Sequence, residues 1–269
     1  MNPISLASGV MPDTSPVDTV RAAAAGGFDA VGLWVDPAEW RAATTRDTRS
    51  ALADTGLPVL DVEVIWLKPD DDLALHRKVI DIGVELGAKN VLCVSSHPNV
   101  NATVAALTAL CRHAEGSGMR VALEFGIFTA VRDLTGAMAI LEAVGHPLRA
   151  VLIDPIHVDR SSSSIAAIAA IDPALLPYAQ FCDAPAARPD PANFDAIIED
   201  ACDLRRQCGE GDLPLAALYR ALPADIQLSI ELRSKALRDG FPDLGKRARA
   251  VADATRRWLT HHLEGAPTS

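Results

Sequence analysis

Short apolar runs alternate along the chain with longer amphipathic stretches rich in Ala and Leu. The apolar runs have the length and composition of buried strands and cover residues 4–8, 29–35, 58–67, 90–96, 120–126, 149–155, 178–184 and 226–232. Helical patterns lie between them, among others over residues 16–27, 72–88, 102–118, 134–145 and about 246–263. Several of these stretches are followed by glycine just before the next strand, the residue that most often ends a helix, at Gly27, Gly56, Gly87, Gly118 and Gly145.

Eight strands that alternate with helices predict a single (β/α)8 TIM barrel over residues 1–269. The main alternative is a doubly wound open sheet, which usually carries a glycine-rich phosphate loop after its first strand; the segment ASGVMPDTS is not such a loop. One segment breaks the alternation. Residues 185–214 form a long polar excursion after the seventh strand, and we expect it to lie over the barrel mouth, as long functional loops often do.

Charge and cysteine content narrow the function classes. The chain has 25 Lys and Arg against 35 Asp and Glu, and its net charge of −10 disfavours binding to nucleic acid or to an anionic membrane surface. No apolar segment approaches the ~20 residues of a membrane-spanning helix, and the segment MNPISLASGV lacks the features of a signal peptide. Five scattered cysteines without a CxxC pair predict reduced thiols and a cytoplasmic protein.

Polar residues interrupt the apolar runs near the carboxyl ends of strands five to eight, where TIM barrels place their reactive groups. These residues are Glu124 in LEFG, Asp154 and His157 in LIDPIH, Gln180 and Asp183 in AQFCDA, and Glu231 and Arg233 in SIELR. Buried carboxylates need a partner or a metal ion. Three carboxylates and one amide oxygen from four consecutive strands predict a site for a hard divalent cation, Mn²⁺ or Mg²⁺ in preference to zinc.

Each of these residues also has a purely structural interpretation. Glu231 and Arg233 share one strand face and could form an internal ion pair. Asp154 precedes a proline and could shape a turn, Gln180 could be a hydrogen-bonded core amide, and Asp183 could cap the following segment. The metal site is favoured because all four strands carry an oxygen ligand at the same end.

Together the motifs LEFG, LIDPIH, AQFCDA, GEGDLPL and SIELR resemble the xylose isomerase-like barrel superfamily of sugar phosphate isomerases and epimerases, most specifically over residues 120–235. The resemblance implies Glu124, Asp154, Gln180 and Glu231 as metal ligands and Glu124 or Glu231 as the catalytic base. It also implies that His157, three residues after the aspartate ligand, is a catalytic residue that contacts the substrate.

The sequence departs from this pattern at Gln180, where sugar epimerases typically have histidine. A Glu–Asp–Gln–Glu set resembles the 3-dehydroshikimate dehydratase branch, which uses arginines to hold a substrate carboxylate. Arg205 and Arg206 are the candidates for that role, and a solvated helix end is the alternative for both. His97 at the end of strand four and Glu63 in strand three are further candidates for substrate contact, or are rim residues.

The predicted function is therefore a divalent-metal-dependent isomerase or epimerase of a sugar, cyclitol or related polyhydroxy ketone. Proton abstraction next to the carbonyl would give an enediolate. The alternative is a lyase, a dehydratase of the 3-dehydroshikimate or inosose type, in which the same enolate expels a hydroxyl group. The substrate is expected to be a small carbohydrate-like molecule or hydroxylated cyclic ketone, and apolar helix faces favour a homodimer.

Two further readings of the same barrel are weaker. A DNA-repair endonuclease would need a histidine-rich trinuclear zinc site and a basic face, whereas this chain has seven histidines and a net charge of −10. A non-catalytic binding barrel would have no need of the oxygen ligands on strands five to eight.

Overall fold

The computed structural model describes residues 2–264. Eight parallel strands form one sheet in the order β6-β5-β4-β3-β2-β1-β8-β7. The strands are β1 (Ile4–Leu6), β2 (Ala30–Trp34), β3 (Val59–Leu67), β4 (Asn90–Ser95), β5 (Arg120–Glu124), β6 (Arg149–Leu152), β7 (Tyr178–Phe181) and β8 (Gln227–Ile230). The backbone N–H of Gln180 donates to the carbonyl of Ile153 at 2.9 Å, so β7 follows β6 and the sheet is a nearly closed barrel. The predicted single (β/α)8 barrel is confirmed.

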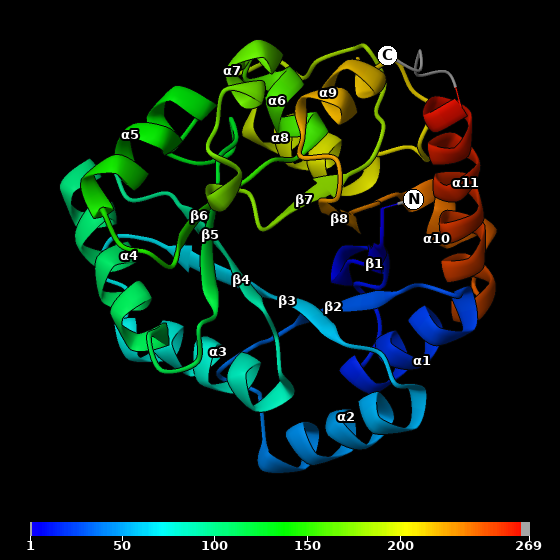
Figure 1. The fold of residues 1–269 in the computed structure, drawn as a ribbon, viewed down its shortest axis with the longest axis horizontal. Coiled ribbons are helices and arrows are strands. Elements are labelled where there is room, and N and C mark those ends of the chain that lie inside the picture. Colours follow the sequence, from blue (N-terminus) through cyan, green and yellow to red (C-terminus); the bar gives the residue numbers. More distant parts are fainter. Residues whose placement is uncertain (1, 265–269) are drawn as a thin grey trace.

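Helices surround the strands on the outside of the barrel (Figure 1). They are α1 (Pro16–Gly26), α2 (Ala42–Thr55), α3 (Leu73–Leu86), α4 (Val100–Ala114), α5 (Leu134–Val144), α6 (Pro155–Arg160), α7 (Ile165–Ala169), α8 (Phe194–Asp203), α9 (Leu215–Ala221), α10 (Lys235–Gly240) and α11 (Leu244–Glu264), with short 3-10 turns η1 (Ser8–Val10) and η2 (Pro173–Leu175). Within residues 2–264, none of these helices is long and apolar enough to cross a bilayer.

The ends of several helices follow from single residues. Gly27, Gly56, Gly87 and Gly145 take left-handed backbone conformations directly after α1, α2, α3 and α5, as the sequence predicts. Gly118 also has a positive φ of 72°, but it lies in a turn four residues after α4. Because residues other than glycine rarely adopt this conformation, the first four glycines end their helices, and Gly118 turns the chain toward β5.

Two apolar regions hold the barrel together. The larger region packs the outer faces of the strands against the helices and includes Leu33, Val62 and Leu123, all fully buried. The smaller region fills the barrel interior with short side chains such as Ala30, Ala122 and Ala150. Alternation of inward and outward side chains along each strand separates the two regions.

The excursion at 185–214 differs from the expected loop because it contains a helix. Asn193 caps α8 by accepting from the backbone N–H of Ala196, and Ile197 on its inner face is buried. Two isolated bridges, Asp183 with Arg206 and Leu204 with Ser234, then attach the chain after α8 to the strand ends. The excursion is therefore an ordered cover over one side of the barrel.

Candidate metal centre and active site

The carboxyl ends of β5 to β8 bring together the four predicted oxygen ligands. Glu124 ends β5 and Gln180 lies in β7, while Asp154 is the second residue after β6 and Glu231 the first after β8. All four side chains are buried, with at most 5% of each residue exposed. The backbone turns sharply after β6 because Asp154 caps α6, accepting from the backbone N–H of Ile156 at 3.0 Å. The four ligands therefore share one rim of the barrel.

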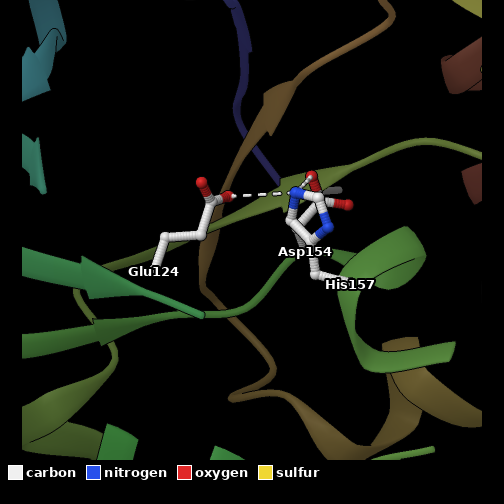
Figure 2. Close-up of side chains that lie close together, drawn as sticks. All are labelled: Glu124, Asp154 and His157. Carbon is white, nitrogen blue, oxygen red and sulfur yellow. Dashed lines mark ion pairs between the residues drawn. The ribbon is translucent and has the colours of Figure 1, made fainter. Parts of the chain in front are cut away.

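His157 lies in the first turn of α6, facing the same point (Figure 2). Its Nε2 atom is 3.9 Å from Oε1 of Glu124 and 3.8 Å from Oδ2 of Asp154. Burial lowers the pKa of His157 to about 4, and the charge of Arg205 acts in the same direction although Asp154 opposes it. The imidazole is therefore neutral near pH 7 and offers one N–H donor and one nitrogen lone pair to a bound molecule.

The carboxamide of Gln180 faces two carboxylates. With its nitrogen turned toward them, it donates to Oε1 of Glu124 at 2.8 Å and to Oδ2 of Asp154 at 2.9 Å. With its oxygen turned toward them, three oxygens crowd together, which requires a cation among them. The position of Gln180 therefore suits either a hydrogen-bonded amide or a metal ligand.

Arg205 enters the site from the segment after α8 and forms a buried ion pair. Its Nη1 atom donates to Oδ2 of Asp154 at 2.6 Å and to the carbonyl of Glu231 at 3.1 Å, and its Nε donates to the carbonyl of Ala201. Burial on its own would raise the pKa of Asp154, but the adjacent guanidinium outweighs it and holds that pKa below its ordinary value. Asp154 is thus a carboxylate that keeps lone pairs free beside its hydrogen bonds.

Arg206, the next residue, points away from the site. Its side chain is exposed and donates to the carbonyl of Glu210 at 3.2 Å, while its backbone pairs with Asp183. Asp183 itself accepts from the backbone N–H groups of Ala184, Gly209 and Leu213, and so holds the loop that follows. Neither side chain lines the site.

Glu231 pairs with Arg233, as the i, i+2 spacing allows. The Nε atom of Arg233 donates to Oε1 of Glu231 at 2.8 Å, whereas Oε2 of Glu231 is buried without a hydrogen-bond partner. Glu63 in β3 faces the same cavity and accepts from the hydroxyl of Ser8. Burial and the neighbouring Glu231 raise the pKa of Glu63 to about 7.

Negative charge exceeds positive charge among these buried groups. Four carboxylates, of Glu63, Glu124, Asp154 and Glu231, face two guanidinium groups in the site cavity and its immediate walls. Burial and the nearby Asp154 raise the pKa of Glu124 well above its ordinary value, which is the response of a buried carboxylate with insufficient counter-charge. If all four carboxylates are ionised, the two missing positive charges equal the charge of one divalent cation.

A cavity of about 150 Å³ opens above these groups. Aromatic side chains that the sequence analysis did not single out form its wall, namely Trp34, Trp66 and Phe128. Phe128 packs on the ring of His157 with 4.9 Å between ring centroids. Trp34 and Trp66 lie near the ends of β2 and β3, so the strand-end rule that located the carboxylates would also have located these two.

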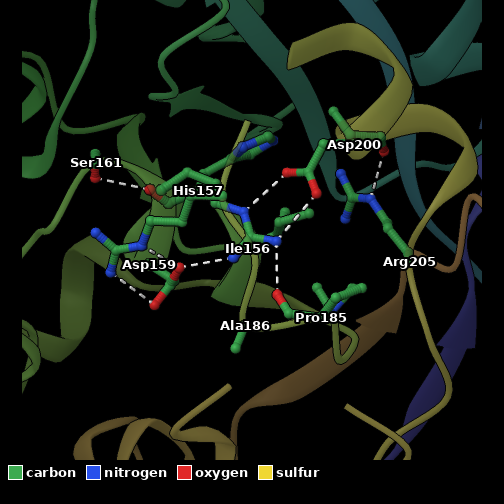
Figure 3. Close-up of polar contacts among 12 residues, drawn as sticks. Ile156, His157, Asp159, Ser161, Pro185, Ala186, Asp200 and Arg205 are labelled. Atoms are coloured by element: carbon green, nitrogen blue, oxygen red, sulfur yellow. Dashed lines mark hydrogen bonds and ion pairs between the residues drawn. The ribbon is translucent and has the colours of Figure 1, made fainter. Parts of the chain in front are cut away.

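Helix α8 covers one side of this cavity with Ala201 and Cys202. Arg160 of α6 donates to both carboxylate oxygens of Asp200 in α8, at 2.8 and 3.0 Å, and to the carbonyl of Pro185 at 2.9 Å (Figure 3). Because both side chains are buried, this bidentate pair fixes α8 relative to α6. The excursion therefore contributes a cavity wall through α8, which the Arg160–Asp200 ion pair holds in a fixed position against α6.

His97 lies outside this cavity. It lines a separate surface hollow together with Lys68, and its Nδ1 atom accepts from the backbone N–H of Asn99 at 3.0 Å. Of the residues predicted to contact substrate, Glu63, His157 and Arg205 line the site cavity, and His97 and Arg206 do not.

Asp61 is buried in β3, two residues before Glu63, and both of its carboxylate oxygens lack a hydrogen-bond partner. The hydroxyls of Tyr178 and Ser229 are buried without partners too. Burial raises the pKa of Asp61 well above its ordinary value, and Glu63 and Glu231 add to this effect. Asp61 therefore binds its proton more tightly in the folded state than in the unfolded state.

Asp61→Asn should stabilise the metal-free protein, more at about pH 8 than at about pH 5. A raised carboxyl pKa destabilises the folded state progressively as the pH rises above the unfolded-state value of about 3.9, at about 1.4 kcal/mol per unit. Thermal unfolding in the presence of a chelator measures the effect, with the exposed Asp54→Asn as a control expected to change stability by less than about 0.5 kcal/mol. A lower melting temperature for Asp61→Asn at about pH 8 would contradict this prediction.

The sequence was also compared with known protein families. The sequence profile of the xylose isomerase-like TIM barrel family matches residues 20–260. The chain belongs to this family. The sequence matches no curated protein.

Solved structures of the family have the same fold at low sequence identity. A xylose isomerase-like TIM barrel/4-hydroxyphenylpyruvate dioxygenase fusion protein is 20% identical with a TM-score of 0.79; the match covers 100% of this chain and 45% of the fusion protein. The IolI protein with a bound zinc atom is 17% identical with a TM-score of 0.77, over 99% of this chain and 100% of that one. D-allulose 3-epimerase from Methylomonas sp., in complex with D-allulose, is 16% identical with a TM-score of 0.72, over 97% of each chain.

Proposed function

We propose that this member of the family is a divalent-metal-dependent isomerase or epimerase of a sugar, cyclitol or related polyhydroxy ketone. The observation that carries the proposal is the set of buried oxygens at the ends of β5 to β8, with Oε2 of Glu231 left without a partner. Buried carboxylates of this kind are stable only when they are paired or bound to a metal. The family resemblance supports the same reaction class, and two of the fold neighbours are sugar 3-epimerases.

Glu124, Asp154, Gln180 and Glu231 would hold the cation. An oxygen-only set favours Mn²⁺ or Mg²⁺, because nitrogen and sulfur ligands are the ones that favour zinc. When bound, such an ion supplies Lewis-acid stabilisation of the negative charge that develops on the substrate carbonyl. His157 is close enough to Glu124 and Asp154 to be an alternative ligand, since ligand atoms of the three lie within 4.8 Å of one another.

The chain's own residues would perform the proton transfer. Glu124 or Glu231 accepts the proton from the carbon next to the carbonyl, since both carboxylates are buried at the rim where the substrate would lie. The neutral His157 donates to a substrate hydroxyl or exchanges a proton with the enediolate. The aromatic wall and α8 reduce access of water to the reacting atoms.

A dehydratase reaction is the second candidate. It is supported by Gln180 and by an arginine in the cavity that could bind a substrate carboxylate. Nε and Nη1 of Arg205 are engaged by Asp154 and by two carbonyls, which leaves only its Nη2 for a substrate carboxylate. Arg233 is better placed. It lines the cavity, and its side chain is 23% exposed. Of the three nitrogens of its guanidinium group, only Nε donates a hydrogen bond to a residue within 2–264.

Metal removal and restoration tests the proposal. Chelated protein is assayed with ketoses and cyclic polyhydroxy ketones, then again after addition of Mn²⁺, Mg²⁺ or Zn²⁺, with products followed by NMR and ultraviolet absorbance. We expect interconversion of isomers only with metal. Loss of water with an ultraviolet-absorbing product would favour the lyase instead, and turnover unaffected by chelation would contradict both.

His157→Ala separates a catalytic role from a ligand role. We expect metal content near that of the wild type and a kcat lowered by roughly 10²–10⁴-fold, the usual effect of losing an acid–base group. Asp154→Ala should instead lose the metal together with activity. Elemental analysis and steady-state kinetics on both variants check this, and a His157→Ala protein that retains full turnover or loses its metal would show that the assigned role is wrong.

A further inference from the structure

A second cavity of about 320 Å³ lies beside the site cavity at the ends of β1 and β2. Trp34 and Arg233 line both cavities, so the two hollows meet at these side chains. The guanidinium carbon of Arg233 lies 6.0 Å from the centre of the Trp34 ring, within reach of a cation–π contact. The second cavity has about twice the volume of the first.

The walls of the second cavity are largely apolar. Met11, Pro12, Pro16, Trp34 and Trp40 contribute to them. Trp34, the last residue of β2, is 48% exposed. Binding of an apolar group against the exposed indole removes apolar surface from water, which favours the bound state.

The polar groups in this cavity are mostly occupied. The hydroxyls of Thr14 and Thr19 lie 2.9 Å apart, and each is also within hydrogen-bond distance of a main-chain carbonyl to which it can donate instead. Asp36 accepts from the backbone N–H groups of Ala38 and Glu39. Apolar surface predominates in this cavity, although the carboxylates of Asp36 and Glu39 also line it. It therefore offers mainly apolar contacts to a neutral group, whereas the site cavity gathers the buried carboxylates of Glu63, Glu124 and Glu231.

We propose that the second cavity binds an aromatic or alicyclic ring attached to the polyhydroxy part of the substrate. This inference rests on the proposed function for the identity of the polar part, which occupies the site cavity next to Glu124 and Glu231. The ring stacks against Trp34 and the apolar wall beyond it. The site cavity, at about 150 Å³, is the smaller of the two, so a ring appended to the polar part extends into the larger hollow.

Binding of two matched glycosides tests this inference. Phenyl and methyl β-D-glucopyranoside share the same sugar and differ only in the appended group, and calorimetry on the intact protein measures both affinities. We expect the phenyl glycoside to bind at least about tenfold more tightly, a difference of about 1.4 kcal/mol. Equal affinities, or no detectable binding of either glycoside, would overturn the proposal.

A filling variant shows which hollow holds the ring. Thr44 in α2 lines the second cavity but not the site cavity, and Thr44→Phe should remove the preference for the phenyl glycoside. Ala43→Phe, at an exposed neighbouring position outside both linings, should retain it. A preference that survives Thr44→Phe would place the ring elsewhere and contradict the proposal.

The glycosides have no free carbonyl, so their binding does not depend on turnover. If the phenyl glycoside binds more tightly while no ketone is converted, the ring-binding role of the second cavity is supported and the proposed reaction is contradicted. If ketones are converted while the two glycosides bind equally, the proposed reaction is supported and the ring-binding role of the second cavity is contradicted.

Discussion

Glu231→Gln should lower kcat by at least about 10³-fold and weaken metal binding by at least about tenfold. Oε2 of Glu231 is buried without a partner, and an amide in its place carries no charge to attract a cation or a proton. Kinetics at saturating metal and calorimetric titration with Mn²⁺ measure the two effects separately.

Glu85→Gln is the matched control for this variant. Glu85 is an exposed carboxylate in α3 and lines neither cavity, so its replacement changes the net charge equally without touching the buried oxygens. We expect wild-type kcat and metal affinity for Glu85→Gln. A Glu231→Gln protein that behaves like this control would remove Glu231 from both the ligand set and the catalytic groups.

Arg205→Met should destabilise the fold by about 3–5 kcal/mol, because it leaves Asp154 buried without its ion-pair partner. The pH dependence has a definite sign. Arg205 holds the pKa of Asp154 low, so its stabilising contribution is present above the unfolded-state pKa of about 3.9 and is lost as the pH falls through the lower folded-state value. The penalty should therefore be largest near neutral pH and smaller in acid.

Urea unfolding of metal-free protein measures this penalty. Arg206→Met is the control, since Arg206 is exposed and is expected to contribute less than about 0.5 kcal/mol. The double variant Arg205→Met with Asp154→Leu should recover part of the lost stability, because it removes the unpaired charge. Equal stabilities for the two arginine variants would contradict the role of Arg205.

Local patterns in the sequence were sufficient to predict the barrel. Buried parallel strands are continuous apolar runs, and glycine is the residue that tolerates the left-handed turn at positions such as Gly27 and Gly87. The boundaries were less accurate. The run at 149–155 continues past the end of β6 because Asp154 leaves the strand to cap α6.

The candidate site was predictable only as far as strand ends determine it. Arg205 and Arg206 were equivalent candidates in the sequence. Because consecutive residues in an extended segment point in opposite directions, one of them is buried and the other exposed, and no local pattern shows which. Helix α8 was missed because prolines and acidic residues surround it, and its order depends on Asp200 pairing with the distant Arg160. Such pairings depend on tertiary contacts, which no local pattern specifies.

A crystal structure of the protein soaked in Mn²⁺ tests the central claim most directly. The proposed function predicts one anomalous peak at the ends of β5 to β8, within about 2.3 Å of carboxylate or amide oxygens of Glu124, Asp154, Gln180 and Glu231. Crystals without a peak at this position, from protein that converts a polyhydroxy ketone in the same buffer, would contradict it.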